Sequence, residues 1–167
     1  MNHFERFDLT PFLIDALNRN QLSNPTEIQE RLIPSLLNGK SAIGQSQTGT
    51  GKTLAFALPL LTRIDPNQEV CQAVVTAPTR ELADQLYQVI ISLLPEGDHP
   101  YRVRKVVGGT DRKRLMTRLK NVPHVVVGTP GRISDIVKEQ ALDIRRCQSM
   151  QGGRRLLRQR FPRSENH

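Results

Sequence analysis

The sequence predicts an α/β fold in which helices cover both faces of a parallel sheet. Strand-like and helix-like patterns alternate along the chain. Two of the strand-like runs, "AVV" at 73–75 and "VVV" at 125–127, are entirely apolar. Strands of a covered parallel sheet are buried on both faces, so they lack the apolar–polar alternation of a half-exposed strand. The 167 residues are enough for one such domain with its own core.

Residues typical of helix starts mark the first two helices. Thr10 offers an N-cap hydroxyl and Pro11 suits the first helical position, so we expect a helix that ends before Asn24-Pro25. A second helix is expected from Thr26 to about Leu37. The remaining elements follow from apolar spacing. We expect strands at 41–44, 72–77, 101–107 and 124–129, and helices at 52–64, 80–94, 110–121 and 131–140.

The helix expected at 80–94 has a clear buried side. Its apolar face consists of Leu82, Leu86, Val89, Ile90 and Leu93. The helix expected at 110–121 is polar, and we expect most of it to be exposed. Its basic run "DRKRLMTRLK" is typical of a solvated helix face, so we assign it no binding role.

Composition and cysteine spacing narrow the classes of protein. No apolar run is long enough to span a bilayer, and the opening "MNHFERFDLT" has no hydrophobic signal region, so we expect a cytoplasmic protein. The two cysteines, Cys71 and Cys147, are far apart and lack the CxxC spacing of a metal site. We therefore expect neither a disulfide framework nor a zinc site.

The net charge of +8 comes mainly from the end of the chain. Residues 145–167 hold seven arginines against one acid, Glu165, a net of +6, which leaves +2 for residues 1–144. A high positive charge is typical of nucleic-acid-binding proteins. Here the body of the protein is nearly neutral, so a nucleic-acid assignment has to rest on its motifs.

The strongest motif is "SQTGTGKT", at 46–53. A strand, a glycine-rich loop and a helix start form a P-loop, whose backbone N–H groups and helix dipole bind phosphates. We expect Lys52 to reach the β- and γ-phosphates of a nucleotide and Thr53 to ligate Mg²⁺. The predicted phosphate-binding residues are Ser46, Gln47, Thr48, Gly49, Thr50, Gly51, Lys52 and Thr53. Ser46 departs from the usual first glycine, and the alternative is a flexible loop that only caps a helix.

Five motifs in order resemble the N-terminal, ATP-binding lobe of DEAD-box RNA helicases, a P-loop NTPase domain of the RecA-like type. The resemblance covers residues 4 to about 144. The motifs are "NPTEIQ" (24–29), "SQTGTGKT" (46–53), "PTRELA" (78–83), Gly108-Gly109 and "TPGR" (129–132).

The resemblance implies an ATP site. Gln29 would bind the adenine edge, since a primary amide matches its donor and acceptor. Thr26-x-x-Gln29 is also a capping box, which is the alternative role. The resemblance adds the upstream aromatic Phe4, and also Pro25 and Thr26, to the cofactor-binding residues. Many members have Gly-Phe where this chain has Gln21-Leu22, which predicts weaker stacking on the base.

The resemblance also implies contacts with an RNA backbone, which position a strand without reading its sequence. Thr79 and Thr129 have an alternative role as helix N-caps beside prolines. The expected RNA-binding residues are Pro78, Thr79, Arg80, Gly108, Gly109, Thr129, Pro130, Gly131 and Arg132.

No Asp-Glu-Ala-Asp run occurs in the 167 residues, although the family places one on the strand after the "TPGR" helix. We expect a helicase domain at 1–144 that is truncated, with its sheet incomplete on the C-terminal side, and a disordered arginine-rich tail at 145–167. The abrupt composition favours a lost reading frame near Ile144, and the alternative is a genuine RNA-binding tail. The nucleotide sequence past codon 144 distinguishes the two.

The missing motif also bears on activity. In the family its first acid holds the Mg²⁺ shell, and a second lobe supplies an arginine finger, so little of the electrostatic catalysis remains. We expect this chain to bind ATP and RNA but to show no unwinding and negligible ATP hydrolysis. The alternatives are a non-catalytic ATP- or RNA-binding module, and a basic RNA-binding protein with a vestigial P-loop.

Overall fold

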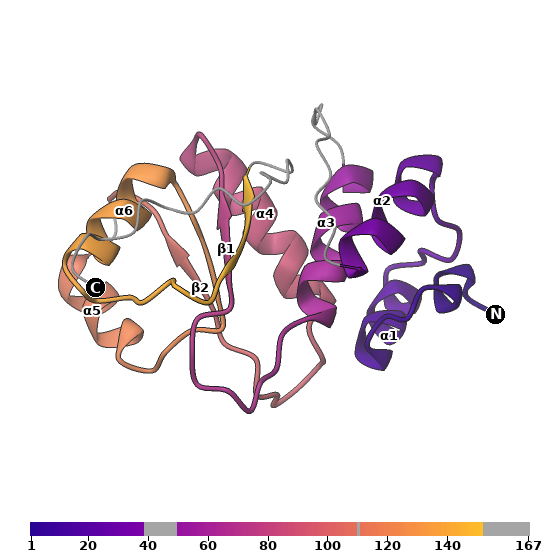
Figure 1. Ribbon diagram of the computed structural model, residues 1–167, viewed down its shortest axis with the longest axis horizontal. Coiled ribbons are helices and arrows are strands. Elements are labelled where there is room, and N and C mark those ends of the chain that lie inside the picture. The colour runs from indigo at the N-terminus through magenta and orange to yellow at the C-terminus, as the bar shows by residue number, and fades with distance from the viewer. Residues whose placement is uncertain (39–49, 110, 152–167) are drawn as a thin grey trace.

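The protein is described by a computed structural model at residues 1–38, 50–109 and 111–151 (Figure 1). The strand predicted at 41–44 lies outside these residues. The elements are η1 (His3–Arg6), α1 (Pro11–Arg19), α2 (Glu27–Leu37), α3 (Thr50–Thr62), β1 (Ala73–Thr76), α4 (Arg80–Leu93), β2 (Val103–Val106), α5 (Arg112–Leu119), β3 (Val125–Gly128), α6 (Pro130–Lys138) and β4 (Gln148–Gln151).

The described strands form one parallel sheet in the order β2-β3-β1-β4. Ala73 in β1 is aligned with Val125 in β3, and Val125 is aligned with Val103 in β2. The apolar strands β1 and β3 occupy the centre, and every residue in them is buried. The predicted α/β class with a parallel sheet is therefore confirmed.

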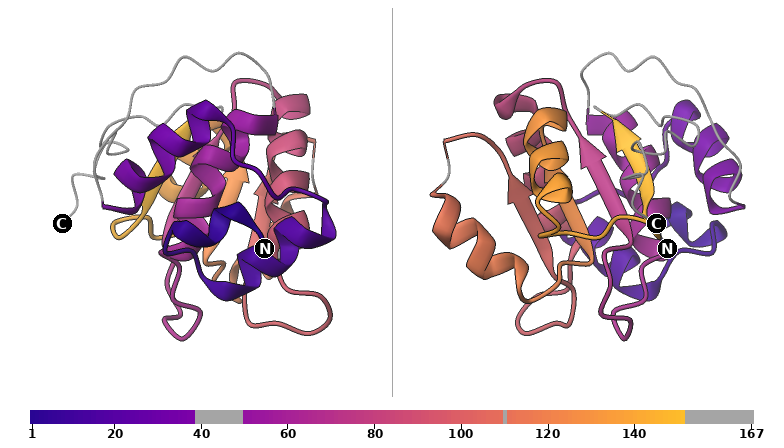
Figure 2. Two further views of the ribbon diagram at one scale, coloured as in Figure 1. Left: turned by 90° about the vertical axis from the view of Figure 1, so that its right-hand side faces the viewer. Right: turned by 60° about the vertical axis from the view of Figure 1, so that its left-hand side comes forward.

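Helices cover both faces of the sheet, as predicted (Figure 2). Val75 and Val127 pack into a core shared with α1, α2, α3 and α4. Val74 and Val126 point to the opposite face and pack against α5 and α6. This division follows from the alternation of side chains along each strand.

The predicted helix faces agree with the structure. In α4, Leu86, Ile90 and Leu93 are buried, and α5 buries Leu115 and Leu119 while most of its other side chains are exposed. No helix among the described residues is long and apolar enough to cross a membrane.

Regular structure continues past residue 144, where the sequence predicts the tail to begin. A turn in which the Cys147 N–H donates to the Ile144 carbonyl oxygen (3.1 Å) leads into β4. β4 pairs with β1, with Gln148 aligned to Ala73, and forms one edge of the described sheet. The sheet thus includes residues that the sequence analysis placed in the tail.

Candidate nucleotide and RNA site

Three of the predicted motifs follow strands that end at the same edge of the sheet. β1 leads to Pro78 and Thr79, β2 to the Gly108-Gly109 doublet, and β3 to Thr129. Because the strands are parallel, their carboxyl ends meet at one edge, where open α/β sheets bind ligands. The Thr129 N–H donates to the Val106 carbonyl oxygen (3.3 Å), which holds the β3 loop against the end of β2.

Arg80 and Gly109 are in contact although they come from different motifs. Gly109 has a φ of +83°, a left-handed conformation that favours glycine. A Cβ atom on Gly109 would lie 2.8 Å from Nη1 of Arg80. The guanidinium group therefore lies over the glycine backbone, in space that any side chain at residue 109 would fill.

Gly128, at the end of β3, belongs to none of the predicted motifs. A Cβ atom there would lie 2.0 Å from the carbonyl oxygen of Val106 in β2. Glycine is required because the two strands approach each other closely at this point. The only sequence signal is its place at the end of the apolar run "VVVG". This contact sets the spacing of the loops that carry Gly109 and Thr129.

The two threonines at helix starts differ in how their hydroxyls are used. Thr79 is the N-cap of α4, and its Oγ1 accepts a hydrogen bond from the Leu82 N–H (3.2 Å). Thr129 is the N-cap of α6 and precedes Pro130 at the first helical position, but its side chain makes no cap hydrogen bond. The capping role is therefore present at Thr79, whereas the Thr129 hydroxyl is not used for capping.

The remaining predicted RNA-binding residues differ in exposure. Arg132 is half-buried, and its Nε is buried without a hydrogen-bond partner among the described residues. Thr129 and Pro130 are also half-buried. The exposed ones are Pro78, Thr79, Arg80, Gly108, Gly109 and Gly131.

Gln29 joins the start of α2 to the start of α3. Its backbone N–H donates to Thr26 Oγ1 (3.3 Å) and its Oε1 accepts from the Thr26 N–H (2.8 Å), so the predicted capping box is present. Its Nε2 also donates to the Gly51 carbonyl oxygen (3.0 Å). The side chain is buried, and it links the "NPTEIQ" segment to the phosphate-binding loop.

The described part of the P-loop lies in the first turn of α3. α3 begins at Thr50, and Gly51, Lys52 and Thr53 follow, each half-buried. The first N–H groups of a helix have no partner within it and carry the positive end of its dipole, which suits a phosphate. These three residues therefore fit a nucleotide. Ser46, Gln47, Thr48 and Gly49 lie outside the described residues.

Phe4 lies in the hydrophobic core, with 1% of its surface exposed, and its ring packs edge-on against Phe7 with centroids 6.2 Å apart. The side chain of Asn2 holds this segment: its Oδ1 accepts from the Phe4 N–H (2.9 Å), and its Nδ2 donates to the Leu22 carbonyl oxygen (2.8 Å). Phe4 is thus buried beside the segment that leads to half-buried Pro25, a placement that favours packing over direct contact with a base.

Comparison with known proteins gives several relatives. The chain is 52% identical over 149 residues to the DEAD-box ATP-dependent RNA helicase CshB of Bacillus subtilis, a match covering 88% of this chain and 34% of that protein. CshB of Listeria monocytogenes is 44% identical over 149 residues, covering 89% of this chain and 34% of that protein. The chain thus spans about a third of the length of these curated relatives.

Solved structures agree with this result. S. cerevisiae Dbp5 bound to RNA and ADP BeF3 matches with a TM-score of 0.77 and 31% identity, covering 90% of this chain and 38% of that one. A DEAD box protein from Methanococcus jannaschii matches with a TM-score of 0.77 and 32% identity, covering 89% of this chain and 40% of that one. Residues 26–151 match the DEAD/DEAH box helicase family. The chain belongs to the DEAD/DEAH box helicase family.

Proposed function

We propose that this chain is the nucleotide- and RNA-binding part of a DEAD-box ATP-dependent RNA helicase that acts in the cytoplasm. The observation that carries the proposal is the contact between Arg80 and Gly109 at the carboxyl edge of the sheet. Arg80 of the "PTRELA" motif and Gly109 of the glycine doublet meet there, and both are exposed. Such an arrangement suits a phosphate backbone, because a guanidinium group can bind a phosphate while a glycine lets the strand come near.

ATP binding is assigned to the start of α3 and to the segment before α2. Lys52 would bind the β- and γ-phosphates and the Thr53 hydroxyl would hold Mg²⁺, which would neutralise phosphate charge. Gln29 hydrogen-bonds the adenine edge. The remaining proposed cofactor-binding residues are Pro25, Thr26, Ser46, Gln47, Thr48, Gly49, Thr50 and Gly51, and Phe4 contributes through packing rather than through contact with the base.

The existing contacts of Gln29 are compatible with adenine binding. A primary amide has two N–H donors and two acceptor lone pairs. The Thr26 N–H takes one lone pair of Oε1, and the Gly51 carbonyl oxygen takes one N–H of Nε2. One donor and one acceptor are left, which matches the paired donor and acceptor on an adenine edge.

RNA binding is assigned to the carboxyl edge of the sheet. Arg80 supplies charge, and the Thr79 hydroxyl can donate its proton to a phosphate while its oxygen caps α4. The Thr129 hydroxyl, which does not cap α6, is also suited to this role. The other proposed contacts are Pro78, Gly108, Gly109, Pro130, Gly131 and Arg132.

A pair of binding measurements tests the proposal. Lys52→Ala should weaken the binding of a fluorescent ATP analogue by about tenfold or more, since charged hydrogen bonds contribute roughly 1.5–3 kcal/mol. Arg80→Ala should weaken the binding of a single-stranded oligoribonucleotide and leave ATP binding unchanged. Lys138→Ala, on the exposed end of α6, is the matched control. The proposal fails if Lys52→Ala leaves ATP binding intact.

We also propose that this chain binds ATP without turning it over, because its sequence contains no Asp-Glu-Ala-Asp run. An RNA-stimulated phosphate-release assay checks this, and measurable turnover abolished by Lys52→Ala would contradict it. The alternative, a basic RNA-binding protein with a vestigial P-loop, predicts RNA binding that is lost when residues 152–167, which follow β4, are deleted and that is unchanged by Lys52→Ala.

A further inference from the structure

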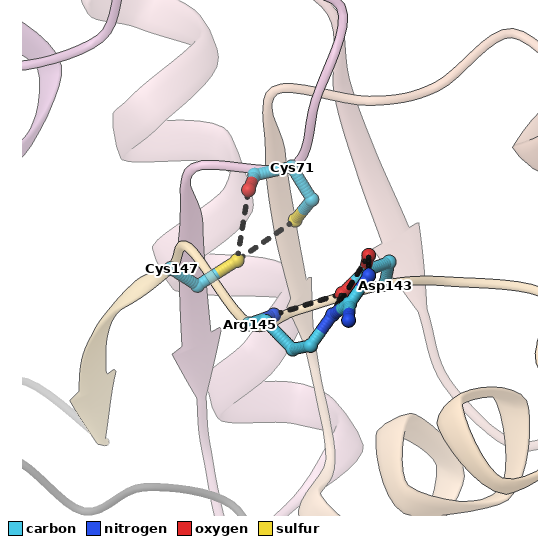
Figure 3. Close-up of polar contacts among 4 residues, drawn as sticks. All are labelled: Cys71, Asp143, Arg145 and Cys147. Atoms are coloured by element: carbon cyan, nitrogen blue, oxygen red, sulfur yellow. Dashed lines mark hydrogen bonds and ion pairs between the residues drawn. The ribbon is translucent and has the colours of Figure 1, made fainter. Parts of the chain in front are cut away.

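The two cysteines of the chain lie in contact at the amino ends of neighbouring strands (Figure 3). Cys71 precedes β1 and Cys147 immediately precedes β4. Their sulfur atoms are 3.3 Å apart, and Cys147 Sγ is 3.2 Å from the Cys71 carbonyl oxygen. Both are free thiols. The chain has only two cysteines, so each has the other as its sole possible partner within the molecule.

The fold creates this contact between residues 76 positions apart. The parallel register of β1 and β4 aligns Ala73 with Gln148 and so brings the residues before the two strands together. An ion pair lies on the approach to β4: the Arg145 guanidinium donates to both carboxylate oxygens of Asp143, and the Arg145 backbone N–H donates to Asp143 Oδ1 (3.0 Å). Figure 3 shows this ion pair directly beside the thiols.

We propose that Cys71 and Cys147 are an oxidation-sensitive pair, which closes to a disulfide in the presence of a small-molecule disulfide and thereby fastens β4 to β1. Sequence spacing argues against a disulfide framework, but the register of the strands supplies the proximity that spacing lacks. The inference does not depend on ATP or RNA binding.

The reaction proceeds in two exchange steps with oxidised glutathione as the oxidant. The Cys147 thiolate attacks one sulfur of oxidised glutathione, a mixed disulfide forms, and one glutathione thiolate leaves. The Cys71 thiolate then attacks the sulfur of Cys147 and expels the second glutathione. The two cysteine protons end on the two glutathione thiols, so two thiols are oxidised and one disulfide is reduced.

Exposure sets the order of these steps. Cys71 is 1% exposed, whereas Cys147 is half-buried, so only Cys147 can meet the oxidant directly. The hydrogen bond with Cys71, followed by burial, raises the pKa of the Cys147 thiol well above its ordinary value. Because the thiolate is the nucleophile, the reaction should be slow at neutral pH and accelerate as the pH rises.

A closed disulfide would act on the ladder between β1 and β4. Among the described strands β4 pairs with β1 alone. A covalent link between Cys71 and Cys147 ties the start of this ladder together and also restricts the unfolded chain, because it closes a long loop.

The experiment incubates the full chain with oxidised glutathione at pH 8, followed by non-reducing peptide mapping with mass spectrometry. We expect a monomer that has lost two hydrogen atoms and contains a linked Cys71–Cys147 peptide. In a glutathione redox buffer at equilibrium, the ratio of the Cys71–Cys147 disulfide to the mixed disulfide should be at least about tenfold higher than in concentrated guanidinium chloride, where the two thiols meet only by closing a long loop. Amides of β1 and β4 should then exchange about tenfold more slowly in the oxidised chain.

Cys71→Ala and Cys147→Ala provide the matched controls. Cys71→Ala should stop at the mixed disulfide on Cys147, and Cys147→Ala should resist oxidation, since only buried Cys71 is left. The unfolded-chain comparison uses no variant, so it holds even where a variant folds poorly. The proposal is overturned by a stable mixed disulfide in the unmodified chain, by disulfide-linked dimers as the main product, or by an equal ratio of the intramolecular to the mixed disulfide in native and denaturing conditions.

Discussion

The two ends of the sheet are built for different purposes. At the carboxyl ends of β1, β2 and β3 the chain exposes Arg80 and Gly109 and brings backbones close together at Gly128. At the amino ends, hydrogen bonds join the segments that precede the strands: Nδ1 of the fully buried His124, before β3, accepts from the Arg102 N–H, before β2 (3.0 Å). One end leaves groups available for a ligand, and the other uses its polar groups to fix the strands.

The largest expected effect is at the close approach on the carboxyl end. Gly128→Ala places a Cβ atom 2.0 Å from the Val106 carbonyl oxygen and must push β2 and β3 apart. We expect a loss of about 3 kcal/mol in the free energy of unfolding, at the upper end of overpacking costs. Urea denaturation measures this loss. Gly131→Ala is the control, because a Cβ atom there meets nothing within 4 Å. Equal stability of both variants would show that the strands are not in close contact.

The next effect separates backbone strain from the contact with Arg80. Gly109→Ala should cost roughly 1–2 kcal/mol for its left-handed backbone and should also displace the guanidinium group, weakening RNA binding. Gly97→Ala is the matched control, since Gly97 has a φ of +73° with no atom within 4 Å of its Cβ position. Unfolding and RNA titrations of both variants distinguish the two terms. Equal RNA binding in both variants would show that Arg80 does not contribute to RNA binding.

Local sequence signals predicted the strands and helix caps better than the contacts between strands. The apolar runs of β1 and β3, and the N-caps at Thr26 and Thr79, depend on neighbouring residues and could be predicted. The contact between Gly128 and Val106 depends on how two strands are aligned, which the local pattern does not contain.

The amino end was harder to predict for the same reason. β4 has the polar sequence "QSMQ", without the apolar run that identifies a buried strand, and its pairing with β1 decides its structure. The contact between Cys71 and Cys147 follows from that pairing. At the nucleotide site, both roles of Gln29 could be considered from sequence, but its bond to Gly51 required the arrangement of α2 and α3.

A smaller effect distinguishes the two helix starts at the carboxyl end. Thr79→Ala removes the bond to the Leu82 N–H and should cost about 1 kcal/mol in the free energy of unfolding. Thr129→Ala should cost clearly less, because the Thr129 side chain makes no cap bond. Thermal unfolding of both variants, with Thr79→Ser as the rescue, checks the difference. Equal costs would mean that Thr129 also stabilises the start of α6.

The smallest expected effect is a pH dependence at the amino end, since it concerns the proton on one side chain. Burial, reinforced by the nearby charge of Arg102, lowers the pKa of His124 below its usual value of 6.5. The unfolded chain then binds a proton more readily than the folded chain, so the stability due to His124 is complete above pH 6.5 and is lost as the pH falls below it. Urea denaturation at pH 7.5 and 5.5 should show this loss. His124→Asn, whose Oδ1 can still accept from the Arg102 N–H, should reduce the loss, whereas exposed His3→Asn should not. If His124→Asn keeps the full pH dependence, the loss of stability at low pH does not come from protonation of His124.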